Sequence, residues 1–173
     1  MKHITYMILM NLFAVVTLMA AASASAKSAY EVFDLPVAKL PRGCVKSDLS
    51  PNEKTPRPFV LSTNKHVKAF CEGDLPGLID YSTTKEMFIL CFREKNEIGI
   101  YGWRLTSAES ASALFAKASA KYANRAADMK LWINNDVVVL LWRDQGVTDA
   151  CFQIFQEHVA RTISKMKPDP TIP

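Results

Sequence analysis

The chain has 173 residues and a formal net charge of +4, and 49% of its residues are hydrophobic. Six glycines and nine prolines exclude a collagen-like or low-complexity chain, and the apolar content excludes a disordered one. The length fits one domain. The small net charge and the lack of a dense basic patch argue against nucleic-acid binding.

Residues 1–26 have the pattern of a secretory signal peptide. Lys2 supplies a positive charge, and the apolar stretch Ile4–Ala22 runs into small residues that resemble a cleavage site. We expect cleavage near Ala26 and a periplasmic or secreted mature protein, with no stable membrane insertion after cleavage. The alternative is an uncleaved anchor, because the apolar stretch is just long enough to span a bilayer.

All four cysteines follow the predicted cleavage site. An even number in an exported protein is typical of two disulfide bonds. No C-x-x-C spacing occurs, which argues against a thioredoxin-type redox site and a zinc ribbon. We expect Cys44 to pair with Cys71, and Cys91 with Cys151. The other pairings, and buried cysteines that stay as thiols, are left open.

Proline divides the chain. Residues 27–76 contain six prolines, residues 77–167 contain none, and residues 168–173 contain three. Because proline removes a backbone donor and disrupts helices and central strands, regular structure should concentrate in 77–167. We therefore expect one domain over 27–167, with edge strands and a long surface loop in 27–76 and a flexible tail at 168–173.

The compact part begins with a predicted hairpin. Met87–Arg93 and Ile98–Leu105 are strand patterns, and Lys95–Glu97 is a plausible turn between them. Thr106 then opens a capping box, in which Glu109 reaches back to it. The helix that follows extends to about Arg125. Its buried stripe contains Leu114, Ala118 and Tyr122, with Phe115 beside them.

The same pattern then occurs again. Met129–Ile133 and Val137–Arg143 are strand patterns around a turn at Asn134–Asp136, and Thr148 can cap a helix that ends near Lys165. The buried stripe of this helix contains Phe152, Phe155, Val159 and Ile163. Trp103-Arg104 matches Trp142-Arg143 at an offset of 39 positions, and the helix stripes match at an offset of 41. A strand–strand–helix unit is therefore predicted twice, by duplication or by convergent patterning.

Together these elements predict an α+β fold, with an antiparallel sheet of five or six strands and two helices on one face. Met87–Phe92 and Val137–Trp142 are apolar without alternation, which indicates strands covered on both faces. With both helices on one face, the other face needs a further cover. The first half of the mature chain, through Tyr30–Leu35 and Phe59–Leu61, can supply it, as can a dimer partner or a bound ligand.

Motifs for catalysis and metal binding are missing from the sequence. It contains no HExxH, GxSxG, P-loop, EF-hand or dinucleotide-binding pattern, and we expect no metal or cofactor. Of the two histidines after the cleavage site, His66 fits an exposed strand entry and His158 a partly buried helix position. The enzymatic alternative is a small hydrolase that uses His158 with a carboxylate: Glu157, Asp149 or Asp80.

Arg104 and Arg143 are candidate binding residues. Each ends a strand and precedes a helix start, where a pair of arginines could hold a carboxylate or phosphate. Each could instead form a structural ion pair, Arg104 with Glu109 and Arg143 with Asp144 or Asp149.

The first predicted helix also carries a basic ridge, because Lys117, Lys121 and Arg125 recur every four residues. This ridge could meet an acidic protein, anionic lipid or a glycan, or be an ordinary solvated helix face.

The sequence favours an exported, non-catalytic interaction or binding module, of which an inhibitor or immunity-type protein is one form. We expect its partner to be another protein or a small anionic ligand, with His158, Arg104 and Arg143 as candidate binding residues. One alternative is a periplasmic small-molecule carrier with an apolar cavity, in which Arg104 or Arg143 anchors an acid group. The other is the hydrolase built on His158. The sequence indicates no oligomeric state.

Overall fold

The computed structural model describes residues 29–47, 59–61 and 78–166. The predicted signal peptide, most of the proline-rich loop with His66 and Cys71, and the predicted tail lie outside these residues. No helix in the described part of the chain is long and apolar enough to cross a membrane.

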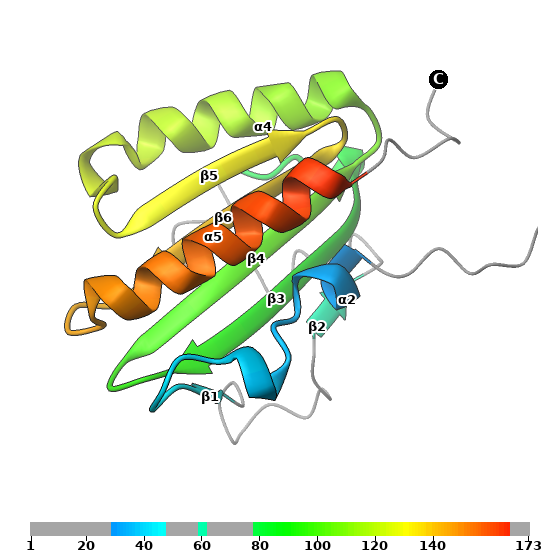
Figure 1. The fold of residues 1–173 in the computed structure, drawn as a ribbon. Coiled ribbons are helices and arrows are strands. Elements are labelled where there is room, and N and C mark those ends of the chain that lie inside the picture. The colour runs from blue at the N-terminus through cyan, green and yellow to red at the C-terminus, as the bar shows by residue number, and fades with distance from the viewer. Residues whose placement is uncertain (1–28, 48–58, 62–77, 167–173) are drawn as a thin grey trace, which may run out of the picture.

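A six-stranded antiparallel sheet forms the centre of the molecule (Figure 1). Its strand order is β1-β3-β4-β6-β5, and β2 also pairs with β3. The two predicted hairpins are present with strand ends close to those expected. They consist of β3 (Thr84–Arg93) with β4 (Glu97–Leu105) and of β5 (Met129–Asn134) with β6 (Val137–Arg143).

The N-terminal part of the domain is built from short elements. It contains α2 (Ala29–Phe33), the 3-10 turn η1 (Val37–Lys39), β1 (Val45–Lys46) and β2 (Phe59–Leu61). Both short strands pair with β3, so the first half of the chain does supply edge strands. A further 3-10 turn, η2 (Tyr81–Thr83), leads into β3.

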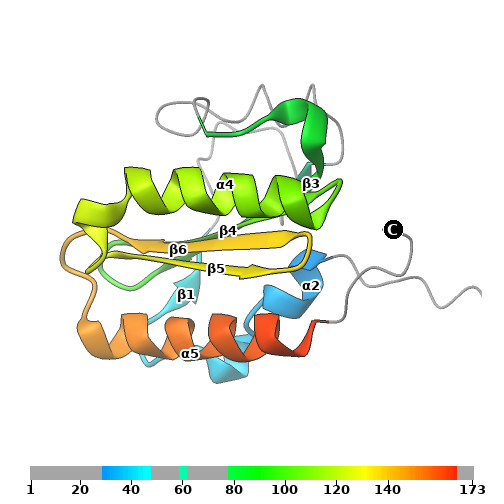
Figure 2. The same ribbon diagram turned by 90° about the horizontal axis from the view of Figure 1, so that it is seen from above.

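Each hairpin is followed by one long helix. α4 (Ala108–Lys121), continued by the 3-10 turn η3 (Ala123–Arg125), follows the first hairpin, and α5 (Asp149–Lys165) follows the second. The predicted strand–strand–helix order is therefore present twice. Figure 2 shows α4 on one side of the sheet and α5 on the other, so the prediction that both helices share one face is wrong.

The sheet register explains where the repeat holds and where it fails. Tyr101 lies opposite Leu140, and these residues are separated by the same 39 positions that separate the two Trp-Arg pairs. A two-fold axis through this pair, perpendicular to the sheet, carries Trp103 onto Trp142 and Arg104 onto Arg143. A rotation about this axis maps each face of the sheet onto itself. It therefore relates the two hairpins but not the two helices.

The apolar strands are covered on both faces, as their composition requires. On the α4 face, α4 buries Ala111, Leu114 and Ala118 against strand residues such as Met87, Ile89 and Trp103. On the α5 face, α5 buries Phe152, Phe155, Val159 and Ile163 against residues such as Ile98, Ile100 and Leu141. The predicted helix stripes are thus confirmed, although they face opposite sides of the sheet.

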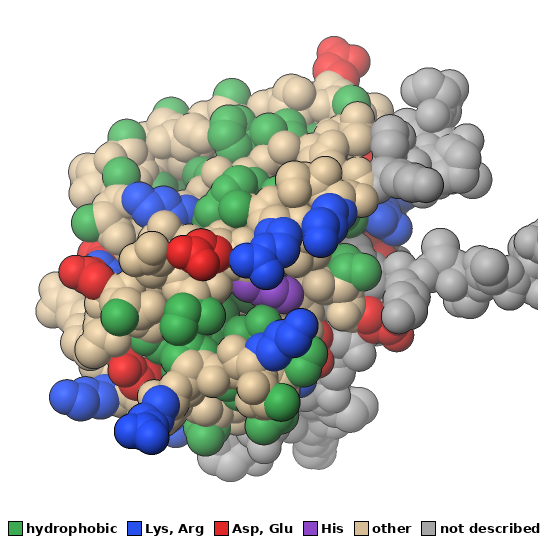
Figure 3. All heavy atoms as spheres, viewed as in Figure 1, with side chains coloured by type: hydrophobic (Ala, Val, Ile, Leu, Met, Phe, Trp, Pro, Cys, Tyr) green, Lys and Arg blue, Asp and Glu red, His purple; other side chains and the backbone are tan. Residues whose placement is uncertain are grey.

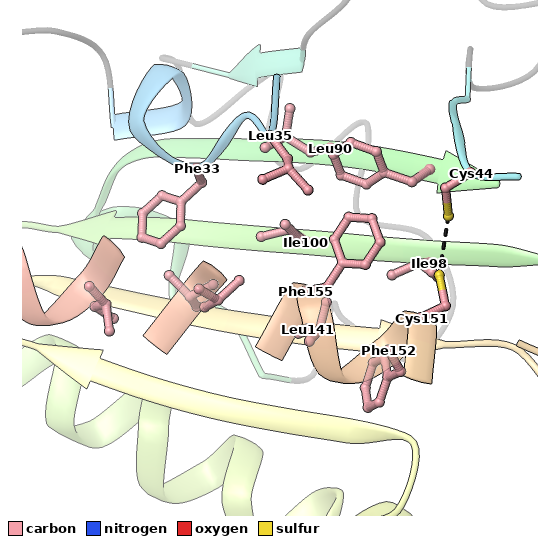
Figure 4. Packing of buried hydrophobic residues seen from close by; sticks show 14 of the residues in the cluster. Phe33, Leu35, Cys44, Leu90, Ile98, Ile100, Leu141, Cys151, Phe152 and Phe155 are labelled. Carbon is pink, nitrogen blue, oxygen red and sulfur yellow. Dashed lines mark hydrogen bonds between the residues drawn. The ribbon is translucent and has the colours of Figure 1, made fainter. Parts of the chain in front are cut away.

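The α5 face is shared with the N-terminal segment, residues 29–47. Phe33 and Leu35 are buried in the same cluster as Phe155 (Figure 4). The ring of Phe33 stacks on Phe88 of β3 with 5.4 Å between ring centroids. The first half of the chain therefore contributes cover to one face, as the sequence suggested, beside α5 rather than in its place.

The start of α4 differs from the predicted capping box. Ser107, not Thr106, is the N-cap, and its Oγ accepts a hydrogen bond from the Ser110 amide at 3.1 Å. The amide of Thr106 donates to the Thr83 carbonyl at 2.8 Å, so Thr106 still belongs to the end of the sheet. The predicted cap of α5 is confirmed, because Thr148 Oγ1 accepts from the Cys151 amide at 3.3 Å.

Two glycines of β4 make room for aromatic rings on opposite faces. A side chain at Gly102 would overlap the ring of Phe88 on the α5 face, and one at Gly99 would overlap the indole of Trp142 on the α4 face. Both rings lie flat against the backbone because these positions carry no Cβ.

The end of α5 is tied to the second hairpin. The Asn134 side chain, beside the hairpin turn, donates from Nδ2 to the carbonyl of Ile163 at 2.6 Å and to that of Met166 at 3.1 Å. It satisfies two of the carbonyls that a helix end leaves without a partner.

Candidate functional site

Arg143 lies beside the first turn of α5, and its positive charge is neutralised by two carboxylates of the same chain. Its guanidinium contacts Asp128 Oδ1 at 2.9 Å and Asp149 Oδ1 at 2.7 Å, and it donates to the Val147 carbonyl at 3.3 Å. It also stacks over the Phe152 ring at 4.7 Å. Burial by itself lowers the pKa of Arg143, but the two carboxylates outweigh burial and raise it.

Arg104 forms its ion pair at the other end of the sheet. Its Nε lies 3.4 Å from Oδ2 of the buried Asp136, rather than against the expected Glu109. In the β4–β6 register, Arg104 pairs with Val137 and Arg143 with Ile98. A separation of six residues along a strand is roughly 20 Å. The two arginines therefore cannot grip one small anion.

The N-terminus of α5 already holds a carboxylate. Glu94, from the β3–β4 turn, accepts hydrogen bonds from the Thr148 amide at 3.1 Å and from the Thr148 hydroxyl at 3.2 Å. A helix N-terminus favours negative charge, and here the chain supplies that charge itself. The predicted anion site beside Arg143 is therefore filled by the protein's own acidic side chains.

His158 lies between α5 and the N-terminal segment. Its Nε2 is 2.9 Å from the carbonyl oxygen of Phe33, which identifies Nε2 as the protonated nitrogen in the neutral ring. Burial lowers the pKa of His158, with Arg161 and Lys39 adding to the effect, while the bond to Phe33 opposes it. His158 thus occupies the partly buried, hydrogen-bonded position that the sequence suggested.

The carboxylates proposed as partners of His158 do not meet it in a shared cleft. Asp149 is in the ion pair with Arg143, nine positions before His158 on α5. Asp80 accepts from the Ser82 amide at 3.0 Å and lines a small hollow beside α4, on the opposite side of the sheet. Glu157 is exposed and contacts Gln153.

The cysteines divide between the two faces. Cys44 and Cys151 are both buried on the α5 face, and their sulfur atoms are 3.2 Å apart. Cys91 is buried in the cluster on the α4 face. This arrangement contradicts the predicted Cys91–Cys151 pairing, because the sheet separates the two side chains. Burial raises the pKa of Cys44 and raises that of Cys151 to about 12.

Within residues 29–47, 59–61 and 78–166, no group of three or more His, Cys, Asp or Glu side chains could hold a metal ion. The basic ridge is exposed, but only Lys117 and Lys121 lie on α4, and Arg125 follows it in η3. Lys121 lies over the ring of Tyr122, with 5.9 Å from its Nζ to the ring centroid.

A different feature stands out at the sheet edge formed by β5. Among the described strands, none pairs with the outer side of β5, and all six of its residues are half-buried. Figure 2 shows this edge in front, with α4 above it and α5 below. In Figure 3, hydrophobic side chains reach the surface along the strip where β5 runs.

The hydrogen-bonding direction of β5 follows from one contact. The Arg143 amide donates to the Asp128 carbonyl at 3.0 Å. In an antiparallel pair, every second residue points its backbone N–H and C=O groups at the neighbouring strand, so this bond identifies which residues of β5 face β6. With the observed register, the backbone groups of Lys130, Trp132 and Asn134 face β6. Those of the alternate residues, Met129, Leu131 and Ile133, face outward.

A hollow of about 380 Å³ lies beside this edge, between β5 and α5. Its lining is mostly polar and includes Lys130 from the edge strand and Gln153, Gln156 and Glu157 from α5. In the same view of the surface, acidic and basic side chains are interspersed and form no patch of one sign (Figure 3).

Comparison with known proteins gives no relative: no family model, no curated protein and no solved structure matches this chain. The site must therefore be argued from its own residues.

The sequence predicts a candidate site at Arg104, Arg143 and His158, and not at the β5 edge. A signal for the edge was present. Met129–Asn134 is apolar except for Lys130 and the terminal asparagine, and a lysine within an apolar strand is typical of an edge that must avoid uncontrolled pairing.

Proposed function

We propose that this protein is an exported, non-catalytic binding module that accepts an extended segment of another protein along β5. The observation that carries the proposal is the outer edge of β5, which presents backbone donors and acceptors between two helices. Edges of this kind take up a partner by strand addition, in which backbone hydrogen bonds supply affinity and side-chain pockets supply specificity.

The backbone of β5 defines how a partner would bind. Met129, Leu131 and Ile133 offer their amides and carbonyls outward, as deduced from the ladder. A partner strand that pairs with all three would form up to six backbone hydrogen bonds, since each residue carries one donor and one acceptor.

The two sides of β5 define the chemistry of the partner strand. The side chains of Leu131 and Ile133 pack toward the α4 face, and those of Lys130 and Trp132 point to the α5 face, where the polar hollow lies. Because side chains alternate along a strand, the favoured partner has apolar residues toward α4. Toward α5 it has polar residues that can reach Lys130, Gln153 and Gln156.

The export of the protein is part of the proposal and rests on the signal-peptide pattern of residues 1–26. An inhibitor or immunity-type protein is one form of such a module. The carrier and hydrolase alternatives have less support. Helices α4 and α5 pack their own side chains against both faces of the apolar strands. The ring of His158 contacts a backbone carbonyl rather than a carboxylate.

The test uses a substitution that removes one outward amide. Leu131→Pro deletes a backbone donor that β6 does not use, and edge strands tolerate proline at such positions. Leu131→Val keeps the amide and is the matched control. Both variants and the wild type are immobilised and exposed to the exported-protein fraction of the source cells, and a retained partner is then purified and its binding measured.

We expect the wild type and Leu131→Val to retain the same partner and Leu131→Pro to bind it at least tenfold more weakly. Hydrogen exchange on the wild-type complex tests the same edge without any substitution. The amides of Met129, Leu131 and Ile133 should become protected when the purified partner binds. Equal binding by Leu131→Pro, or no added protection in β5, would show that the partner uses another surface.

A further inference from the structure

Two buried thiols from distant parts of the chain meet at the start of α5. The sulfur atoms of Cys44 and Cys151 are 3.2 Å apart, although 107 positions separate the residues in the sequence. Cys44 is 8% exposed and Cys151 is 3% exposed. Figure 4 shows the two side chains directed at each other, one from the segment before β1 and the other from α5.

The backbone on each side of this contact is already positioned. The Cys44 amide donates to the Pro41 carbonyl at 2.9 Å, closing a turn in which Gly43 has a positive φ of 85°. The Cys151 amide is held by the Thr148 cap. A disulfide needs its sulfur atoms about 2.05 Å apart, so the two side chains would have to approach by only about 1 Å.

Near Cys44 the N-terminal segment is held by backbone contacts: β1 pairs with β3, and the Ser47 amide donates to the Cys91 carbonyl at 2.9 Å. Val37 is 70% exposed and Val45 is 57% exposed, and β1 has only two residues. Lys46 contacts Asp34 at 2.6 Å, but Lys46 is exposed, Asp34 is only half-buried, and both belong to the same segment. The contact between His158 and Phe33 lies at the other end of the segment, seven positions further along α5 than Cys151.

We propose that Cys44 and Cys151 form a disulfide bond that locks the N-terminal segment onto the first turn of α5. The bond would close a loop spanning most of the described domain. It would hold Phe33 and Leu35 in the α5-face cluster. Without the bond, the position of these two residues depends on the few contacts of the short helix α2. The bond is independent of the proposed binding at β5, which lies at the opposite edge of the sheet from β1.

The chemistry needs an oxidant, which we assign to the class of disulfides, either a small-molecule disulfide or a protein disulfide oxidase. One cysteine thiolate attacks the oxidant's sulfur and releases one oxidant thiol, leaving a mixed disulfide. The second cysteine thiolate attacks the sulfur of the first and releases the other oxidant thiol. The two cysteines lose two protons and two electrons, and the oxidant disulfide gains them as two thiols.

The burial of the pair indicates when this exchange occurs. The attacking species is the thiolate, and the pKa of Cys151 is raised to about 12 in the folded protein. Attack is therefore slow once the segment has closed over α5, and the bond should form during folding. For the same reason the completed bond should resist reduction by added thiols until the domain opens.

The experiment maps the cysteines of the wild-type exported chain without any substitution. The protein is unfolded in the presence of a thiol-blocking reagent, so that buried free thiols also react. It is then digested without reductant, and linked peptides are identified by mass spectrometry. We expect a peptide pair that joins Cys44 to Cys151. Linkage of Cys44 to Cys71, or blocking reagent on both Cys44 and Cys151 after unfolding in the presence of the reagent, would overturn the proposal.

Variants test the lock itself. Cys44→Ala and Cys151→Ala should each lower the melting temperature by about 10 °C, and the double variant should melt near the singles, because all three lack the same bond. Cys91→Ala is the matched buried control, and it should retain the Cys44–Cys151 peptide. Additive effects of the two single substitutions, or a linked wild type whose melting temperature is unchanged by full reduction, would contradict a stabilising bond.

Discussion

The two faces of the sheet solve the same packing problem with helices of different bulk. On the α5 face the helix brings Phe152 and Phe155, and the strands bring Phe88 and Phe92 together with branched aliphatic residues such as Ile98 and Val139. On the α4 face the helix brings alanines and one leucine, and the strands bring aromatic residues such as Trp103. On the α4 face, small helix residues therefore face large strand residues, whereas on the α5 face aromatic rings of the helix and of β3 pack on each other, with 4.7 Å between the ring centroids of Phe155 and Phe92. Both arrangements fill the space between helix and sheet, as close packing requires.

The difference has a consequence for how the repeat is interpreted. The hairpins share a two-fold relation, and the equivalent residues Trp103 and Trp142 both lie on the α4 face. With these two indoles on that face, the small-residue stripe of α4 fits there, whereas the Phe-rich stripe of α5 packs on the opposite face. Side-chain volume thus separates two helices that a strict repeat would place together.

The largest expected effect compares the central helix residue on each face. Phe155→Ala should destabilise the protein by about 3–5 kcal/mol and Leu114→Ala toward the lower end of about 2–5 kcal/mol. Phe155 is fully buried and its ring centroid is 4.7 Å from that of Phe92, so its removal leaves the larger cavity. Urea unfolding of both variants measures the difference. A Leu114→Ala loss equal to or above that of Phe155→Ala would show that α4 anchors the domain more strongly.

The two glycines of β4 give a second comparison at the level of single methyl groups. Gly102→Ala should cost about 1–3 kcal/mol, since overpacking in a dense core has that magnitude. The new Cβ would meet the buried Phe88 ring, which has no room to move. Gly99→Ala should cost less, because the indole of Trp142 is half-buried and can tilt outward. Thermal unfolding of the two variants tests this order, and the reverse order would place the tighter packing on the α4 face.

Helix caps provide a smaller and closely matched pair. Ser107→Ala should reduce stability by about 1 kcal/mol, because it removes the cap bond from the Ser110 amide and the bond from the Ser107 hydroxyl to Ser110 Oγ. Thr148→Ala should reduce it somewhat more, because the Thr148 hydroxyl donates to the Glu94 carboxylate and hydrogen bonds to charged groups are stronger. A parallel Thr148→Ser variant keeps the hydroxyl and should restore most of the loss. If both alanine variants melt at the same temperature, the Glu94 contact adds nothing to the α5 cap.

The smallest effect concerns pH and is confined to the α5 face. Burial lowers the pKa of His158 below its ordinary value of 6.5. The unfolded chain therefore binds a proton before the folded chain does, and stability is lost as the pH falls below 6.5. Asp34 and Lys39 on the N-terminal segment and Arg161 on α5 set the local charge.

His158→Gln can still donate to the Phe33 carbonyl but does not titrate. Denaturant unfolding at pH 7.5 and 5.5 should show a larger loss of stability for the wild type than for this variant, because all other groups titrate in both. Equal losses would assign the pH dependence to groups elsewhere.

Local patterns in the sequence predicted the elements well, for physical reasons that lie within each segment. Val137–Arg143 and the stripe from Phe152 to Ile163 were recognisable because continuous apolar runs and four-residue periodicity are properties of single elements. The side of the sheet that each helix covers was not predictable in this way. It depends on volumes presented jointly by Trp103, Trp142 and the helices, which are far apart in the sequence.

The candidate site was predicted less well than the fold. The sequence pointed to Arg143 as a candidate binding residue, whereas in the structure it is paired with Asp149 and with Asp128, which reaches it only through the β5–β6 register. The predicted Cys91–Cys151 pair was wrong because spacing in the chain carries no information on which face of the sheet a strand residue occupies. His158 was placed correctly as a partly buried helix position, since that follows from its neighbours on α5 alone.

The two bonds from Asn134 to the last carbonyls of α5 bear on how the chain can be engineered. Because the Asn134 side chain caps the last carbonyls of α5, one stop signal for this helix lies in the hairpin, upstream of Met166. Tags or reporter domains attached beyond that point should leave the helix end unchanged. An Asn134→Ala exchange should instead let the last turn of α5 fray and shift any fused partner relative to the sheet.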